Sequence, residues 1–431
     1  MKQKGEPKTH RNETYSCILS IGMETQKIAE VPTESLRKIT YSISPLSKRS
    51  SSTLTIYSFE ESIPKRGFEM DRTALSFLKE LTESFGPAGF EREPAHVVEE
   101  YVRSLADEIL RDKLGSIIFK KKGTAERPHV LLAGHVDEVG FVISGIDKET
   151  GFLTFDTLGG WFDQVLLSQR VLVRTAKGDL PGVIAAKPPH LLPPEELEKV
   201  VKRDKMFIDV GATSREEAEK MGVRIGDPVV PWSPFTTVRE EKVALGKAFD
   251  DRVGAFIATQ VIRELKERGI DHPNTIYGAA TVQEEVGLRG ATTVSHVVDP
   301  DVAVVLEVDI AGDVPEIKSR EAPARMGKGP SILTYDASMI PNQTLKDLAI
   351  RTAEEEKIPY QLSFSARGGT DAGRIHIHKV GCPSIVIGVP TRHIHSHVGL
   401  FSLEDCLNAI SLTVELVRKL DARTVESLTA I

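Results

Sequence analysis

The chain has 431 residues, of which 40% are hydrophobic and 27% charged, and its formal net charge is −7 with a pI near 6.0. The acidic balance argues against nucleic-acid binding driven by bulk charge, and no apolar run reaches the roughly 18 residues of a transmembrane helix, so neither nucleic acid nor a membrane is an expected partner. The three cysteines, Cys17, Cys382 and Cys406, form no CxxC pair. A disulfide framework and a thiolate zinc site are therefore not expected, and a reducing, cytoplasmic setting is predicted.

The first 69 residues differ in composition from the rest of the chain. They contain 11 Lys or Arg, 8 Glu and no Asp, and 18 of them are Ser or Thr. Hydrophobic periodicity is weak there, and no apolar segment typical of a secretory signal follows the first Met. We expect residues 1–69 to form a disordered extension, or to lie upstream of a true start at Met70.

From residue 71 the pattern alternates helical and strand-like segments, which is typical of an α/β domain. "ALSFLKELTESF" and "EPAHVVEEYVRSLAD" are predicted helices, and "HVLLAGHVD" is a predicted buried strand. Short strands separated by Gly, Asp and Pro turns then predict a small β-rich domain at 139–235, inserted into the larger one. After residue 236 a long amphipathic helix, "DDRVGAFIATQVIRELKERG", and three apolar strands return. The predicted α/β domain therefore comprises 71–138 plus 236–431, with a mixed sheet between helices.

Metal-capable side chains follow several of these predicted strands, and one more stands at the start of the long helix. They are His135, Asp137, Glu284, Glu285, Asp309, His393, His395, His397 and Asp250. Open α/β sheets bind ligands beyond the carboxyl ends of their parallel strands, so we expect these residues to meet at one edge. Imidazole and carboxylate ligands without thiolates suit zinc, cobalt or manganese.

Each of these residues also has a simpler interpretation when it is taken alone. Asp250 or Asp251 could cap the long helix. His135 could be a core histidine, and Asp309 could be a turn residue. Glu284 and Glu285 could be a solvated pair at a loop. The joint pattern, in which these residues follow strands of one sheet or begin the long helix, favours a functional site.

The spacing suggests how the residues would share the chemistry. His135 and Asp137 are two residues apart on an extended strand and share a face, so Asp137 can orient the imidazole. Glu284 and Glu285 are adjacent and point in different directions. One can bind metal while the other acts as a general base on a metal-activated water. Five protein ligands suit two divalent ions that share one bridging carboxylate.

Five motifs, in this order, resemble the tetrahedral (TET) metallo-aminopeptidases, the family that includes glutamyl aminopeptidases and "cellulase M"-like proteins. The motifs are "GHVDEVGF", "KAFDDRVG", "VQEEVGLRG", "EVDIAGD" and "TRHIHSHVG". The resemblance extends from about residue 71 to the end. It implies a phosphorylase/hydrolase-like α/β fold with an inserted PDZ-like or barrel domain that supports dimerisation. It also implies dimers that assemble into a tetrahedral dodecamer, and removal of N-terminal residues from peptides with the help of two zinc or cobalt ions.

The resemblance implies five metal ligands, which are His135, Asp250, Glu285, Asp309 and His395. In the family pattern Asp250 bridges the two ions. His135 and Asp309 complete one metal site, and Glu285 and His395 complete the other. Of the three alternating histidines, the pattern Arg-x-Ile-His-Ser selects His395, with His397 as the alternative and His393 as a residue that shapes the site.

The resemblance further assigns Glu284 as the general base and Asp137 as the carboxylate that orients His135. Thr370 and Asp371, in "ARGGTDAG", are expected to line the substrate pocket, although a plain glycine-rich turn is the alternative. Three further histidines, His190, His376 and His378, are expected to be structural.

The sequence leaves three alternatives to peptide hydrolysis. Another metal-dependent amidohydrolase, such as an N-acyl amino acid deacylase, would use the same kind of site. A glycoside hydrolase is less favoured, because it needs two carboxylates about 5 to 9.5 Å apart across a sugar, and the two candidate glutamates are adjacent. A non-catalytic scaffold that kept the fold is the third alternative, and the full ligand set argues against it.

Overall fold

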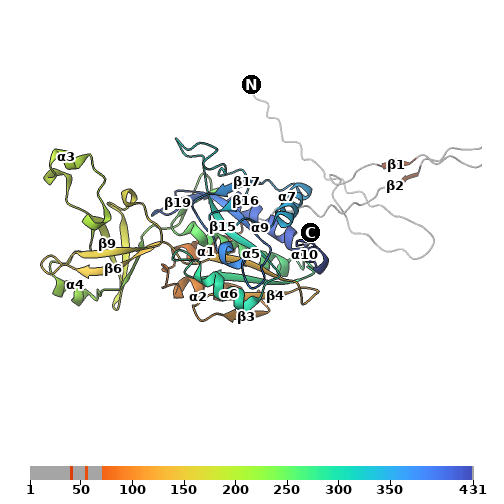
Figure 1. Cartoon of the computed structure of the whole chain (residues 1–431), viewed down its shortest axis with the longest axis horizontal. Coiled ribbons are helices and arrows are strands. Elements are labelled where there is room, and N and C mark those ends of the chain that lie inside the picture. Colours follow the sequence, from red (N-terminus) through yellow and green to blue (C-terminus); the bar gives the residue numbers. More distant parts are fainter. Residues whose placement is uncertain (1–38, 42–53, 57–69, 430–431) are drawn as a thin grey trace, which may run out of the picture. The chain divides into compact units, whose positions relative to one another are not determined.

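The computed structural model describes residues 39–41, 54–56 and 70–429 (Figure 1). Two short strands, β1 (Ile39–Tyr41) and β2 (Leu54–Ile56), pair antiparallel. The prediction of a disordered extension at 1–69 otherwise falls outside the described residues. All features discussed below belong to the second unit of the chain, from residue 70 onward.

The main element of that unit is an 11-stranded mixed sheet. In spatial order it runs β12 (Thr236–Val238), β13 (Val243–Gly246), β19 (Gly399–Ser402), β18 (Ser384–Arg392), β15 (Val302–Ile310), β5 (His129–His135), β14 (Thr275–Thr281), β4 (Ile117–Lys122) and β3 (Glu108–Arg111). Beside β18 lie β16 (Ser331–Asp336) and, paired to β16, β17 (Gln361–Ser365). The central strands β18, β15, β5 and β14 are parallel, so their carboxyl ends share one edge.

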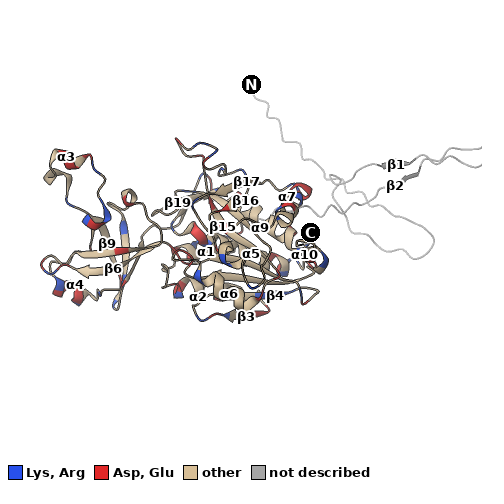
Figure 2. Cartoon of the chain, viewed as in Figure 1, with Lys and Arg blue, Asp and Glu red and all other residues tan. Residues whose placement is uncertain are grey.

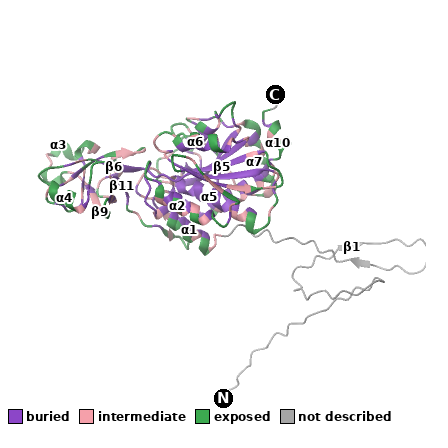
Figure 3. Cartoon of the chain, turned by 90° about the horizontal axis from the view of Figure 1, so that it is seen from below, coloured by how far each residue is buried: buried purple, intermediate pink, exposed green. Residues whose placement is uncertain are grey.

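Helices cover both faces of this sheet, as Figures 1 and 3 show. One face packs against α1 (Arg72–Glu83), α2 (Arg92–Val102), α5 (Phe249–Glu267), α7 (Gln343–Glu356), α9 (Leu403–Val417) and the end of α10 (Ala422–Ser427). The other face packs against α6 (Arg289–Val298) and the short α8 (Ala372–Ile375). In β5, Val130 and Leu132 belong to the first core and Leu131 and Ala133 to the second, as the two-residue period of a strand requires.

The central strands are apolar because both of their faces are covered. Across β5, β14, β15 and β18 the charged residues are Glu307, Asp309 and Arg392, all near the carboxyl ends. Figure 2 shows the sheet mostly in tan, with most of the charged residues on the helices and loops around it. Burying an isolated charge is expensive, so charges at that position call for partners or ions.

A closed antiparallel barrel forms a separate lobe (Figure 3). Its strands, in spatial order, are β10 (Phe207–Asp209), β7 (Leu153–Leu158), β6 (Gly140–Ile146), β11 (Pro228–Pro231), β8 (Arg170–Thr175) and β9 (Gly178–Ala185). Two helices, α3 (Pro194–Leu197) and α4 (Arg215–Met221), and three 3₁₀ turns, η2 (Asp163–Val165), η3 (Pro189–Leu191) and η4 (Arg203–Lys205), lie between the strands. The barrel has its own apolar core, which includes Phe141, Ile143 and Val171.

The predicted fold class is confirmed: a mixed α/β sheet lies between helices and is joined to a small all-β barrel. Within the described residues, no helix combines the length and apolarity needed to cross a membrane.

Candidate active site

Several predicted site residues gather at the carboxyl edge of the four parallel strands. His135 ends β5, and Glu307 lies on the neighbouring β15. Glu284 and Glu285 follow β14, and His395 follows β18. Adjacent parallel strands thus deliver imidazoles and carboxylates to the edge at which α/β sheets bind ligands.

Asp250 lies between the two histidines. Its Oδ1 is 3.3 Å from Nε2 of His135, and its Oδ2 is 3.3 Å from Nε2 of His395. The neighbouring Asp251 points elsewhere, because its Oδ1 accepts the backbone N–H of Gly254 at 3.0 Å, where α5 becomes regularly helical after a non-helical start. The capping role considered from the sequence therefore belongs to Asp251, whereas Asp250 faces both imidazoles.

Two groups of three side chains place possible ligand atoms within 4.8 Å of one another. The first group is His135, Glu284 and Glu307, and the second is His135, Asp250 and Glu285. His395 adjoins the second group, since its Nε2 lies 3.7 Å from Oε2 of Glu285. A set of imidazole nitrogens and carboxylate oxygens without thiolate matches zinc, cobalt or manganese.

The protonation behaviour of these groups shows that they fit a cation. Burial raises the pKa of Glu285 to about 8; the nearby His395 opposes this shift and Asp250 adds to it. Burial likewise places the pKa of Glu284 well above its ordinary value. Among the described residues, Nε2 of His135 and Oε1 of Glu285 are buried without a hydrogen-bond partner. Unpartnered lone pairs and carboxyls that resist ionisation are both satisfied by divalent metal ions.

The pKa values of the two imidazoles are raised as well, although burial alone would lower them. Burial disfavours the charged ring of His395, but the Asp250 hydrogen bond and the charge of Glu285 outweigh it and raise its pKa to about 10. The same competition, with Glu284 as the chief opponent of burial, puts the pKa of His135 well above its ordinary value. For Asp250, the close approach of both imidazoles outweighs burial and lowers the pKa. Protons thus balance the carboxylates here, and metal binding would release them.

The barrel contributes directly to this site through the loop after β7. Nδ1 of His395 donates to the carbonyl of Gly160 at 2.7 Å, which leaves Nε2 facing Asp250. A Cβ added at Gly160 would come within 3.1 Å of that Nδ1, and one added at Gly159 within 3.0 Å of Oε2 of Glu285. The two glycines therefore allow the close approach of the barrel to the site.

Asp137 lies beneath the adjacent glutamates. Its Oδ1 accepts the backbone N–H of Glu284 at 3.0 Å, and its Oδ2 accepts that of Glu285 at 3.1 Å. Nδ1 of His135 is 3.1 Å from the carbonyl of Asp137 and 3.5 Å from its Oδ1. That the Asp137 carboxylate orients the ring of His135 stays a prediction. The hydrogen bonds of this carboxylate go to the backbone of Glu284 and Glu285.

Asp309 lies apart from the other predicted ligands, and its assignment as a ligand stays a prediction. It is absent from both ligand groups, and its side chain lies near Ser331 and Ser363. The reason is strand register. Val305 of β15 is paired with Ala133 of β5. Two residues further along both strands, Glu307 is therefore level with His135. Asp309 lies two residues beyond the level of His135 on the same face of β15.

The other two histidines of the "HIHSH" segment take different positions. His397 is buried, and its ring centroid lies 5.2 Å from that of Trp161 in the barrel. Burial lowers the pKa of His397 to about 4, with no acidic group as a partner. His393 is exposed with φ +62°. Of the three, His395 is the one that faces Asp250.

Thr370 and Asp371 are buried beside the site. The hydroxyl of Thr370 donates to Oδ2 of Asp336 at 2.9 Å, and Asp371 accepts a hydrogen bond from the hydroxyl of Thr281. Burial raises the pKa of Asp371 to about 6; His135 and the Thr281 hydrogen bond oppose the shift. Oδ1 of Asp371 has no partner among the described residues. Three other histidines lie elsewhere: His190 is exposed on η3, His376 contacts the carbonyl of Ala372, and His378 contacts Asp299.

Sequence reasoning missed Glu307, the glycine pair of the barrel and Glu91. Glu91 is buried at the start of α2, and burial with the nearby charge of Asp137 raises its pKa to about 7. The motif "EVD" contained the signal for Glu307, since both of its acids share one face of the strand. No local pattern marks Glu91, which stands in a loop far from the other site residues in sequence.

Comparison with known proteins agrees with the geometry. The family model of the M42 glutamyl aminopeptidases matches residues 115–412. The lysyl aminopeptidase of Pyrococcus furiosus is 36% identical over 347 residues, covering 80% of this chain and 96% of that protein. The crystal structure of a TET aminopeptidase from the marine sediment archaeon Thaumarchaeota archaeon SCGC AB-539-E09 is 61% identical, covers 83% of this chain and 99% of its own, and superposes with a TM-score of 0.82. The Pyrococcus horikoshii TET1 peptidase, which can assemble into a tetrahedron or a large octahedral shell, is 30% identical, with 80% and 100% coverage and a TM-score of 0.71. The chain therefore belongs to the M42 family of aminopeptidases, hydrolases that act on peptide bonds.

Proposed function

We propose that this aminopeptidase removes N-terminal residues from peptides at a centre of two divalent metal ions, zinc or cobalt, with Glu284 as general base. The observation that carries the proposal is the position of Asp250, whose two oxygens each lie 3.3 Å from a different imidazole. A carboxylate between two histidines, each with a further glutamate within 4 Å, is an arrangement suited to bridging two ions.

The proposed ligands are Asp250 as the bridge, His135 and Glu307 on one side, and Glu285 and His395 on the other. Glu307 replaces Asp309, because Glu307 shares a ligand group with His135 and Asp309 does not. When bound, such ions lower the pKa of a water molecule and polarise a carbonyl group.

Glu284 is suited to move the proton of the attacking water. Its Oε2 lies 3.8 Å from Nε2 of His135, so the carboxylate is next to the centre, and burial raises its pKa well above the ordinary value, which favours the acceptance of a proton. In the proposed reaction Glu284 accepts that proton and then returns it to the nitrogen of the departing amine. Asp137 holds the backbone of both glutamates in place through its two oxygens.

Thr370 and Asp371 are proposed to line the substrate pocket. The support is the unpartnered Oδ1 of Asp371 and the closeness of its charge to Glu284. A buried carboxylate with a free lone pair suits the ammonium group of a peptide N-terminus, which would explain cleavage from that end.

We further propose that copies of the chain associate, with the barrel of 139–235 as the dimerisation domain, and that dimers build a tetrahedral dodecamer. The support is the likeness to two TET peptidases, one of which can assemble into a tetrahedron or a large octahedral shell. The domain division proposed from the sequence accords with a barrel whose strands run from Gly140 to Pro231.

The test is hydrolysis of a panel of aminoacyl p-nitroanilides and their N-acetyl counterparts by chelated protein, before and after zinc or cobalt is added. Metal-restored release confined to free-amino substrates is expected. Release of acetate from the N-acetyl compounds, without p-nitroaniline, would identify a deacylase, and no release of p-nitroaniline from any substrate despite two bound ions per chain would contradict the proposal.

A further inference from the structure

The segment Val282–Gly290, which carries the adjacent glutamates, is a tight turn between β14 and α6. Gln283 and Leu288 both have φ +58°, a region that non-glycine residues enter only when their surroundings hold them. On the carbonyl side the turn is closed by its own backbone: the N–H of Leu288 donates to the carbonyl of Glu284 at 2.8 Å and that of Gly290 to Val282 at 2.9 Å. The backbone N–H groups of Gln283, Glu284 and Glu285 are instead directed at side chains from outside the turn.

Carboxylates accept those three successive N–H groups. Asp137 accepts from Glu284 and Glu285 at 3.0 and 3.1 Å, and Glu91 accepts from Gln283 at 3.1 Å through Oε1. The backbone orientation that separates the side chains of Glu284 and Glu285 is thus set by two carboxylates from outside the turn. The mechanism proposed above uses Asp137 but gives no role to Glu91.

Glu91 is built into this contact. The residue is 5% exposed, and the same Oε1 accepts the N–H of Gly89 at 2.6 Å, which fixes its side chain. In the stretch from residue 70 to 429, no Lys, Arg or His forms an ion pair with Glu91. A buried carboxylate without a cation is costly, and its visible contacts are these two backbone amides.

We propose that Glu91 is a positioning residue for catalysis, which acts by holding the backbone of Gln283 so that Glu284 keeps its place beside the metal centre. The inference rests on the proposed role of Glu284. The effect on catalysis would depend on where the acceptor oxygen of residue 91 lies. A neutral side chain of the same length should therefore keep the activity, and a shorter carboxylate should not.

Three variants of Glu91 separate these possibilities. Glu91→Gln keeps an acceptor oxygen at the same distance from the backbone. Glu91→Asp keeps the charge on a side chain that is one methylene shorter. Glu91→Ala removes both the oxygen and the charge. For Glu91→Ala and Glu91→Asp we expect kcat to fall by about 10²-fold, the size of effect that a displacement of about 1 Å produces, with little change in KM. For Glu91→Gln we expect kcat within about threefold of the unaltered enzyme, and all three should bind the same amount of metal.

Glu93 provides a matched control on the same helix. Its Oε1 accepts the N–H of Phe85 at 3.1 Å and its Oε2 pairs with Arg174, but it does not contact the turn. Glu93→Ala should therefore lower the thermal midpoint, as a structural contact would, and leave kcat unchanged.

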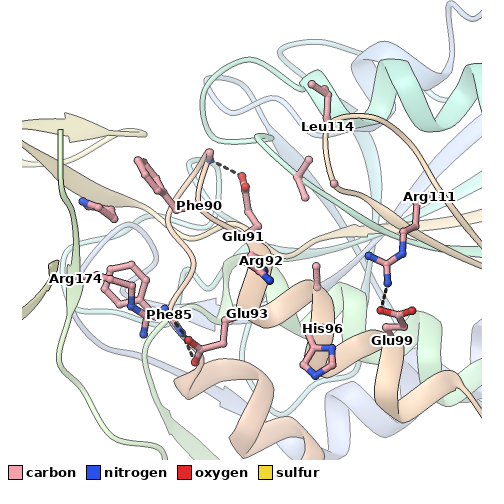
Figure 4. A pocket seen from close by; sticks show the side chains of 15 residues that line it. Phe85, Phe90, Glu91, Arg92, Glu93, His96, Glu99, Arg111, Leu114 and Arg174 are labelled. Atoms are coloured by element: carbon pink, nitrogen blue, oxygen red, sulfur yellow. Dashed lines mark hydrogen bonds and ion pairs between the residues drawn. The ribbon is translucent and has the colours of Figure 1, made fainter. Parts of the chain in front are cut away.

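The cavity beside Glu91 offers a further readout. Glu91 and Val282 both line a cavity of about 880 Å³, together with Phe85, Phe90 and Arg92 (Figure 4). Sodium formate, added to Glu91→Ala, can enter from this side and supply the missing oxygen. A saturable rise of kcat in Glu91→Ala, absent from Glu93→Ala, is expected.

Wild-type kcat in a folded, metal-loaded Glu91→Ala would overturn the inference, and so would a Glu91→Gln enzyme as impaired as Glu91→Asp. Glu284→Gln is assayed in parallel. If that variant is fully active, the proposed base is wrong whatever Glu91 does. If it is inactive while Glu91→Ala is normal, the inference about Glu91 fails alone.

Discussion

Without the proposed divalent ions, the stability of the protein should fall as pH rises, with Glu285 responsible for a large share of the change. Burial raises the pKa of Glu285 from an ordinary 4.5 to about 8. In the folded chain its carboxyl group therefore holds a proton that the unfolded chain releases. The associated stability is fully present below pH 4.5 and is lost as pH rises through about 8.

The magnitude follows from the two pKa values. Each pH unit between them corresponds to about 1.36 kcal/mol, so the whole interval is worth about 5 kcal/mol, and the part between pH ~5.5 and ~8.5 about 3 kcal/mol. Glu285→Gln cannot ionise and lacks this contribution. The variant therefore separates Glu285 from the other buried carboxyls, such as Asp371 and Glu91, which titrate in the same range.

The assay is urea unfolding of chelated protein at both pH values and at one fixed protein concentration, because association also stabilises the folded chain. The unaltered chain should lose about 3 kcal/mol more than Glu285→Gln between the two conditions. Added zinc should reverse the trend, since metal binding selects the ionised carboxylate. Equal losses in the two proteins would refute the reasoning that Glu285 is a buried carboxyl awaiting a cation.

Three further predictions concern single residues of the site. Glu284→Gln should keep both ions by elemental analysis yet lose about 10²- to 10⁴-fold in kcat, the usual contribution of a general base, and full activity with metals in place would exclude Glu284 as base. His395→Ala should bind less metal than the unaltered chain, whereas His397→Ala, whose ring faces Trp161, should retain both ions; equal metal content in the two would contradict the choice of His395. Glu307→Gln should lower metal affinity by about 10-fold or more and Asp309→Asn much less, as measured by competition with a chelating dye, and the reverse order would restore Asp309 to the ligand set.

The sequence was most informative where periodicity and motif spacing act together. The helices, the apolar strands and the barrel were predictable, because buried strands and amphipathic helices leave distinct patterns in a chain. The gathering of His135, Glu284, Glu285 and His395 followed from one rule, that parallel strands place their carboxyl ends at a common edge.

What could not be predicted depends on register and on contacts between distant segments. Glu307 and Asp309 share a face of β15, and only the pairing of β15 with β5 decides which of them is level with His135. Likewise, Asp250 and Asp251 are chemically equal in sequence, and only the start of α5 shows which one caps the helix. Glu91 is 192 residues from the amide it binds, so no local pattern could connect the two.

The carbonyl of Gly160 has a consequence for how this architecture can change over evolutionary time. The barrel has its own apolar core, which by itself would make it an exchangeable module. Yet the proton on His395 is held by a backbone oxygen of the barrel loop, although the histidine itself belongs to the α/β sheet. A replacement module would have to offer an acceptor at the same place and leave the same room beside Glu285. We therefore expect the barrel and the α/β sheet to evolve together, and a chimaera made by exchanging barrels to lose the hydrogen bond that orients His395 before it loses its fold.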